Sequence, residues 1–321
     1  MSVVTIVSIG KATQDVFLKS SKSFEPHMHK GVLYEQLPLG QKLDLDEAIF
    51  TTGGNVTNAA VTFARQGLHS KYIWALGLDP SSQAIMQALD SEGVDTSGVT
   101  QHDWYQASYS TILLSNSGER TILNFHGTDL DGDGKQLNFK ALASADWVYL
   151  SALGDIDLLE VIITKCAEHN VKVMLNPAGA ELKQMAKLKT LLEDVTVLAV
   201  NKEEAQQIVE GQTIEELARH ITHYCPVAIV SDGPHGSVTT DRKTVVTAGM
   251  YEDVPVIDRT GAGDAFGSGF LTKYSQGQSL ADSIIFASAN STSVVGQIGA
   301  KAGILQLDAV LHDMPLTETI F

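Results

Sequence analysis

The chain alternates short runs of β-branched residues with longer amphipathic stretches, and this alternation limits its fold more than any other feature. The strand-like runs stand in the order VVTIVSIG, KYIWALG, DWVYLSA, KVMLNPA, VTVLAVN and VAIVSDG. Stretches with helical spacing of apolar residues, such as NVTNAAVTFARQG and IDLLEVIITKCAEHN, lie between them. Strands separated by helices imply right-handed crossovers and a parallel sheet covered on both faces. The sequence therefore predicts an α/β fold, a three-layer αβα domain with a mostly parallel central sheet.

Two segments interrupt this alternation. Residues 15–51 show no helical period, and residues 99–128 have the pattern of a hairpin with NSGE at its turn. We expect both to be β-rich insertions that form a small sheet, a lid standing off the main domain. The expected main domain is then residues 1–14, 52–98 and 129–321, and the expected lid is residues 15–51 and 99–128.

The charge and composition exclude several classes of protein. The 321 residues include 38 Asp and Glu against 22 Lys and Arg, a formal net charge of −16, so we expect no nucleic-acid partner. No uncharged apolar run reaches the length of a membrane helix, and the N-terminal MSVVTIVSIG has the pattern of a buried strand rather than a signal peptide. Cys166 and Cys225 lie far apart, and we expect them to be reduced thiols of a cytoplasmic protein without a membrane partner.

The stretch DRTGAGDAF, residues 258–266, places two glycines and a carboxylate at the start of an expected helix. The apolar spacing after it is helical, with Phe266, Phe270, Leu271 and Tyr274 before a stop at Gly277. Gly261 and Gly263 would then lie at a helix N-terminus, where unpaired N–H groups favour an anion. Asp264 falls in the first turn, where a carboxylate ordinarily stabilises the helix dipole. The alternative is a base that takes a proton from a hydroxyl attacking a phosphate.

The same stretch resembles the signature Asp-x-Thr-Gly-Ala-Gly-Asp of the PfkB (ribokinase-like) family of small-molecule kinases. The resemblance covers nearly the whole chain in order, through the motifs GKATQD, GGNVTNAA, NKEE and SDGPHG, and through LNPA and SGERTI. It implies the family's fold, an α/β domain with a β-sheet lid. It also implies the family's reaction, in which an alcohol group of a small sugar or nucleoside accepts the γ-phosphoryl group of ATP.

The resemblance assigns roles to particular residues. Asp264 is the implied general base, and the N–H groups of Gly261, Ala262 and Gly263 form the implied anion hole. The implied acceptor site consists of Asp15, Gly53, Gly54, Asn55, Asn58 and Arg120. The implied nucleotide side consists of Asn176, Asn201, Glu204, Ser231, Gly233, Gly236 and Asn290. Asn201 and Glu204 would organise water around Mg²⁺. Asp258, Thr260 and Gly299 are compatible with a monovalent cation such as K⁺.

Three departures from the family pattern leave questions open. Arg259 replaces a small hydroxyl residue and could pair with Asp258, reach a phosphate or face solvent. Ribose-specific members carry a glutamate where this chain has Leu153–Gly154, which argues against ribose as the acceptor. Gly303 stands where a serine is frequent, so a K⁺ requirement stays open.

The acceptor also stays open between a sugar and a nucleoside of the adenosine, guanosine or cytidine type. Trp104 and Tyr109 in the lid could stack on a base, although lid aromatics more often serve packing. A catalytically silent sugar-binding regulator is the alternative from another class. By family analogy we expect a homodimer formed through the lid. We interpret DLDGDGK, residues 129–135, as a surface turn, and His220 and His223 as part of a solvated helix face.

Overall fold

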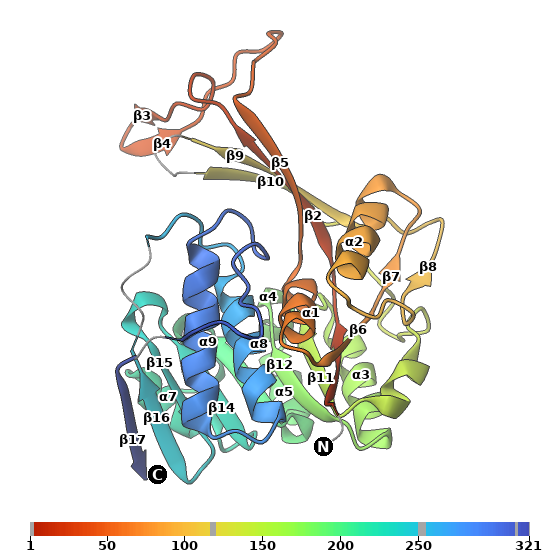
Figure 1. The fold of residues 1–321 in the computed structure, drawn as a ribbon, viewed down its shortest axis with the longest axis vertical. Helices are drawn as coiled ribbons and strands as arrows, with labels where there is room; N and C mark the ends of the chain where they lie inside the picture. Colours follow the sequence, from red (N-terminus) through yellow and green to blue (C-terminus); the bar gives the residue numbers. More distant parts are fainter. Residues whose placement is uncertain (1–2, 116–119, 250–254, 312–313, 321) are drawn as a thin grey trace.

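A large sheet with helices on both faces carries a smaller sheet that projects from it (Figure 1). The computed structural model describes residues 3–115, 120–249, 255–311 and 314–320. The larger sheet has nine strands in the order β17-β16-β15-β14-β13-β12-β11-β1-β6. The parallel strands are β1 (Thr5–Ile9), β6 (His69–Ile73), β11 (Trp147–Ser151), β12 (Lys172–Asn176), β13 (Val197–Asn201) and β14 (Val227–Ser231). The antiparallel edge consists of β15 (Ser237–Thr240), β16 (Thr244–Ala248) and β17 (Leu316–Ile320).

Helices cover the two faces of this sheet. One face carries α1 (Asn55–Arg65), α8 (Ala262–Ser275) and α9 (Leu280–Val295), which pack against one another. The other carries α3 (Ile156–Glu168), α4 (Gly179–Leu182), α5 (Met185–Leu191), α6 (Lys202–Ile208) and α7 (Ile214–Ile221). Because the parallel strands are covered on both sides, β1 is buried along its whole length. This arrangement confirms the predicted three-layer fold.

Local capping explains where several helices begin. Asp155 accepts hydrogen bonds from the first-turn N–H groups of Asp157 and Leu158 and so starts α3. Thr213 and Glu216 form a reciprocal capping box at the start of α7. Helix α2 (Pro80–Ser91), beside the smaller sheet, is capped by Asp79 and has a proline in its first turn.

The smaller sheet has four strands in the order β10-β9-β2-β5. They are β2 (Thr13–Lys19), β5 (Glu47–Gly53), β9 (Ser108–Leu114) and β10 (Arg120–Phe125). Two further pairs of short strands form separate two-stranded sheets: β3 (His27–His29) with β4 (Val32–Tyr34), and β7 (Ala75–Leu76) with β8 (Thr100–Gln101). We call the four-stranded sheet the lid sheet; the turn NSGE expected between β9 and β10, residues 116–119, lies outside the described residues.

Strand register decides which lid side chains share a face. Asp15 in β2 pairs with Thr51 in β5 and with Ser110 in β9, so their side chains lie on one face. Phe50 and Val16, one position along, point to the opposite face. The lid sheet therefore has one face that carries Asp15 and an opposite face that carries Val16 and Phe50.

Both cysteines lie in the core of the larger domain. Cys166 in α3 and Cys225 before β14 are buried free thiols, and burial raises the pKa of each to about 12. A thiol with so high a pKa is inert as a nucleophile at neutral pH. Within the described ranges, no helix is both long and apolar enough to cross a membrane.

Candidate functional site

Polar residues collect at the carboxyl edge of the parallel sheet. Ser151 ends β11 opposite Asn176, which ends β12. The Asn55 amide donates to the Ser151 hydroxyl at 3.0 Å, and that hydroxyl donates to the Asn176 side-chain oxygen at 3.1 Å. The Asn176 amide in turn donates to the carbonyl of Ala199 in β13 at 2.8 Å. This chain of bonds fixes the start of α1 against the sheet edge, and Ser151 is a member that the sequence did not identify.

The glycine turn before α8 depends on two glycines for different reasons. Gly261 has a φ of +80°, and a Cβ placed on it would lie 2.4 Å from the Cβ of Ala300. Only glycine fits this conformation and this close contact. A Cβ on Gly263 would meet no atom within 4 Å, so this residue faces open space. A ligand can therefore approach the first turn of α8 at Gly263.

The first turn of α8 offers N–H groups to such a ligand. The N–H of Ala262 donates to the Arg259 carbonyl at 3.3 Å. Among the residues described, the N–H groups of Gly261, Gly263 and Asp264 have no hydrogen-bond acceptor. Unpaired N–H groups at a helix start attract an anion. The arrangement adds the Asp264 amide to the expected anion hole and gives the Ala262 amide an internal partner.

Asp264 lies in this first turn and is buried, with only 8% of its surface exposed. Its Oδ2 atom accepts a hydrogen bond of 2.8 Å from the side-chain amide of Asn58 in α1. Burial raises the pKa of Asp264 to about 6, although the Asn58 bond and the charge of Lys301 act in the opposite direction. A carboxylate with this pKa is ionised at neutral pH and holds a proton more readily than an exposed one.

Lys301 brings a buried amine to the side of the turn where Asp15 lies, and the sequence analysis did not identify it. Its ammonium donates to the Thr52 carbonyl at 2.6 Å and to the Thr57 hydroxyl at 3.0 Å. Burial lowers the pKa of Lys301 to about 7, against the attraction of Asp15 and Asp264. A lysine in the short apolar stretch IGAKAGI was the signal that could have found it.

Asp15 faces the same region from the lid sheet. Burial raises the pKa of this carboxyl, while a hydrogen bond to Ser110 opposes the shift. A Cβ on Gly53 would lie 2.2 Å from Asp15 Oδ2, so a larger residue there would displace the Asp15 carboxylate. The side-chain oxygen of Asn58 is buried and has no hydrogen-bond partner within the part of the chain described. Asp15, Asn58 and Lys301 thus bring polar groups from three distant segments to one place.

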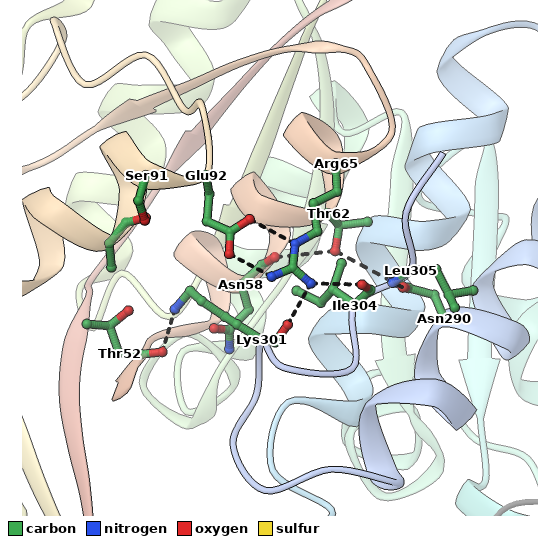
Figure 2. A network of polar contacts seen from close by, with 11 residues as sticks. Thr52, Asn58, Thr62, Arg65, Ser91, Glu92, Asn290, Lys301, Ile304 and Leu305 are labelled. Atoms are coloured by element: carbon green, nitrogen blue, oxygen red, sulfur yellow. Dashed lines mark hydrogen bonds and ion pairs between the residues drawn. The ribbon is translucent and has the colours of Figure 1, made fainter. Parts of the chain in front are cut away.

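A partly buried network of hydrogen bonds joins the segment around Lys301 to the helices (Figure 2). Arg65 in α1 donates to Glu92 and to the carbonyls of Lys301 and Ile304, at distances between 2.6 and 2.9 Å. These bonds fix the backbone carbonyl of Lys301, and so they restrict the positions that its side-chain ammonium can reach.

Asn290 in α9 belongs to this network, whereas the sequence analysis expected it to line a nucleotide pocket. Its amide donates to the Ala265 carbonyl at 2.8 Å, and its side-chain oxygen accepts from the Leu305 N–H at 2.9 Å. The side chain is fully buried and all its described bonds are internal. Asn290 therefore joins α8 to the C-terminal segment (Figure 2).

A cavity of about 530 Å³ opens beside the glycine turn. Its lining residues are Ser231, Gly233, Pro234, Gly236, Ser237, Gly249, Val256, Arg259, Ala262, Gly263, Phe266, Ser288, Ser291, Thr292 and Val295. The cavity thus brings together Ser231, Gly233 and Gly236, predicted for the nucleotide, with Ala262 and Gly263, predicted for the anion hole. Asn176, Asn201 and Glu204 do not line it.

Asn201 and Glu204 form the capping box of α6. The Asn201 side chain accepts from the Glu204 N–H at 2.8 Å, and Glu204 Oε2 accepts from the Asn201 N–H at 2.9 Å. Burial raises the pKa of Glu204. The capping box holds the Glu204 carboxylate at the start of α6, directly after the carboxyl end of β13.

The Asp258 carboxylate organises the turn that precedes α8. Its Oδ1 atom accepts from the Thr260 N–H at 3.0 Å, from the Thr260 hydroxyl at 2.7 Å and from Arg120 at 2.7 Å. Its Oδ2 atom accepts from the Gly299 N–H at 3.1 Å. At Gly303, a Cβ would lie 2.2 Å from the Ser293 carbonyl, so no serine fits there. Any cation at this place would have to bind to backbone carbonyls.

Comparison with known proteins identifies the family of the chain and solved structures with the same fold. A family model described as "pfkB family carbohydrate kinase" matches residues 6–306. The chain is similar to a ribokinase of Staphylococcus aureus (strain COL), with 24% identity over 315 residues that cover 95% of this chain and 98% of the relative. The solved structure of Arabidopsis thaliana ribokinase complexed with ribose and ATP has a TM-score of 0.76 and 19% identity, covering 95% of this chain and 96% of the other. Adenosine kinase of Sinorhizobium meliloti also has a TM-score of 0.76 and 19% identity, with 95% and 98% covered.

Proposed function

The chain belongs to the pfkB family of carbohydrate kinases, which are phosphotransferases, and we propose that it transfers the γ-phosphoryl group of ATP to a hydroxyl of a small carbohydrate. Asp264 acts as the general base. The observation that carries the proposal is that this buried carboxylate lies in the first turn of the helix whose Gly263 opens into the 530 Å³ cavity.

The proposed reaction uses groups on both sides of the glycine turn before α8. ATP enters the cavity with its triphosphate directed to the unpaired N–H groups of Gly261, Gly263 and Asp264. The acceptor hydroxyl forms a bond to the γ-phosphorus while the bond from that phosphorus to the bridging oxygen breaks, and its electron pair leaves with ADP. The hydroxyl proton moves to Asp264. Positioning and charge stabilisation dominate in such transfers.

The acceptor lies on the side of Asp15, Asn58 and Lys301. The buried Asn58 oxygen without a partner and the Asp15 carboxylate are both acceptors for sugar hydroxyls. A buried polar group with no partner is costly unless a ligand satisfies it. Gly53, Gly54 and Asn55 complete this side, because Gly54, just before α1, lies against the backbone of Lys11, Ala12 and Thr13 at the start of β2.

Asn201 and Glu204 fit a magnesium ion held through water. The described residues contain no group of three metal-ligating side chains, which is consistent with an ion bound chiefly by the nucleotide and water. Mg²⁺ bound with ATP would neutralise part of the phosphate charge. A K⁺ ion would have to rely on backbone carbonyls near Asp258, Thr260 and Gly299, since Gly303 offers no side chain.

A nucleoside is the second candidate for the acceptor. The lid face that carries Asp15 also carries Phe17, Ile49 and Ile112, which the strand register places in one row. An apolar row beside a hydroxyl-binding carboxylate suits a nucleobase as well as a sugar. The adenosine kinase among the solved structures with this fold keeps this alternative open.

The experiment that tests the proposal is ADP release with a panel of sugars and nucleosides under saturating MgATP. Turnover that depends on one acceptor class supports the kinase and names the class. If ligands bind tightly but none causes ADP release, the chain is a binding regulator and the proposal is wrong.

The chain forms a homodimer through the face of the lid sheet that lies opposite to Asp15. Phe50, Leu123 and Phe125 lie on the face opposite to Asp15 and are 70%, 56% and 52% exposed. Apolar side chains this exposed on one sheet face favour a partner. Sedimentation velocity of the wild type and of Leu123→Asp tests this assembly: the substitution should shift the population toward monomer.

A further inference from the structure

We infer that Arg259 binds the β- and γ-phosphates of the nucleotide and is a further catalytic residue of the phosphoryl transfer. The inference rests on the proposed function and adds a residue to it.

The first observation is the charge of the cavity. Of the described residues that line it, Arg259 is the only one with a charged side chain; the others are serine, threonine, glycine, alanine, proline, valine and phenylalanine. The chain as a whole has a net charge of −16, so it repels a polyanion from most of its surface. Within the described part of the cavity wall, a triphosphate therefore has one protein cation to approach, together with the amides of the glycine turn.

The second observation is that the Arg259 side chain is available to bind a ligand. The neighbouring Asp258, an obvious partner for it, is already occupied by Arg120, Thr260 and Gly299. No ion pair or hydrogen bond of the Arg259 side chain exists within the described ranges, and the side chain is exposed. Of the three roles that the sequence left open, pairing with Asp258 is thus excluded in this structure.

The third observation is the position of Arg259 along the cavity wall. The Arg259 carbonyl accepts from the Ala262 N–H at 3.3 Å, which ties its backbone to the first turn of α8. The apolar lining, Val256, Phe266 and Val295, suits the base of a nucleotide rather than its phosphates. Arg259 belongs to the same short turn as Gly261 and Gly263, so it is placed for the phosphate end.

The chemistry of a guanidinium fits this place. Its planar set of N–H donors binds two phosphate oxygens at once. As the bond between the γ-phosphorus and the bridging oxygen breaks, negative charge grows on the β-phosphate of ADP. A cation that meets this charge lowers the barrier, and loss of such a group typically costs about 10²–10³-fold in rate.

The test compares Arg259→Ala, Arg259→Lys and Lys243→Ala. Lys243 lies on the exposed turn between β15 and β16, outside the cavity, so its substitution makes the same change in net charge as Arg259→Ala. In Arg259→Ala we expect kcat/KM for ATP to fall about 10²-fold or more, with the KM for the acceptor little changed. Arg259→Lys should recover part of this loss, and Lys243→Ala should behave as the wild type.

Nucleotide binding by titration calorimetry separates this inference from the proposed function, because it needs no acceptor. Arg259→Ala should bind ATP and ADP at least tenfold more weakly and AMP as tightly as the wild type. If ATP and ADP bind Arg259→Ala within twofold of the wild type, the inference is overturned, whether or not the wild type phosphorylates any acceptor. If the wild type shows no turnover but Arg259→Ala loses ATP and ADP affinity selectively, the phosphate contact stands and the proposed reaction fails.

Discussion

The guanidinium of Arg120 in the lid sheet donates to the carboxylate of Asp258, in the larger domain, at 2.7 Å. The two residues are 138 positions apart in the sequence. Asp258 also accepts from Thr260 and Gly299 on either side of the glycine turn. One carboxylate thus connects the lid sheet, the glycine turn before α8 and the C-terminal segment, so lid position and turn geometry are coupled.

A double-mutant cycle tests this coupling. Arg120→Ala and Asp258→Asn should each lower kcat/KM, and the double variant should lose little more than the worse single one, with a coupling of roughly 0.5–3 kcal/mol. Thr121→Ala, an exposed neighbour on β10, is the control. Additive losses would mean that Arg120 acts on the acceptor directly and not through Asp258.

Asp264→Asn should reduce turnover by about 10²–10⁴-fold, the usual range for loss of a general base, while ATP affinity measured by calorimetry stays nearly constant. Asp308→Asn, at an exposed carboxylate, should leave turnover unchanged.

For the wild type, only the ionised form of Asp264 can take the proton. Because its pKa is raised to about 6, kcat/KM should rise with pH through about 6 and then level off. A rate that is flat between pH 5 and 7 contradicts the assignment.

Lys301→Met removes the cation that lies near two buried carboxylates. Since the charge of Lys301 favours the ionised form of Asp264, its loss should raise the Asp264 pKa and move the acidic limb of the pH–rate profile to higher pH. Lys273→Met, at a half-buried lysine of α8, is the matched control and should leave the limb in place. If the acidic limb of the pH–rate profile of Lys301→Met stays where it is in the wild type, the charge of Lys301 does not act on Asp264 and the lysine serves packing alone.

Gly261→Ala and Gly263→Ala should separate a structural from a chemical requirement in the same turn. At Gly261 the added methyl would overlap Ala300 in a left-handed backbone conformation, which should cost roughly 1–3 kcal/mol in the free energy of unfolding. At Gly263 the methyl meets nothing, so urea denaturation should resemble the wild type while kcat/KM for ATP falls. Equal stability of the two variants would contradict the close contact at Gly261.

Local signals were sufficient to predict the fold class and to identify residues that line the cavity. These signals are the alternation of strand and helix patterns, the glycine turn and the motifs in their order along the chain. Gly263, Ser231 and Gly233 could be assigned to one cavity from motifs alone, since parallel strands and their helices meet at one sheet edge. Even so, the same reasoning did not predict the buried bonds of Asn290, which are made to Ala265 and Leu305.

Only the tertiary structure decided how distant side chains meet. Asn58 contacts Asp264 across 206 positions, and Lys301 reaches Thr52 across 249. No local pattern encodes such pairs, because they depend on how helices and the lid sheet pack in three dimensions. The sequence by itself thus determined the fold class and the position of the glycine turn. Packing decided which charges surround Asp264, and it left the Arg259 side chain without a partner among the described residues.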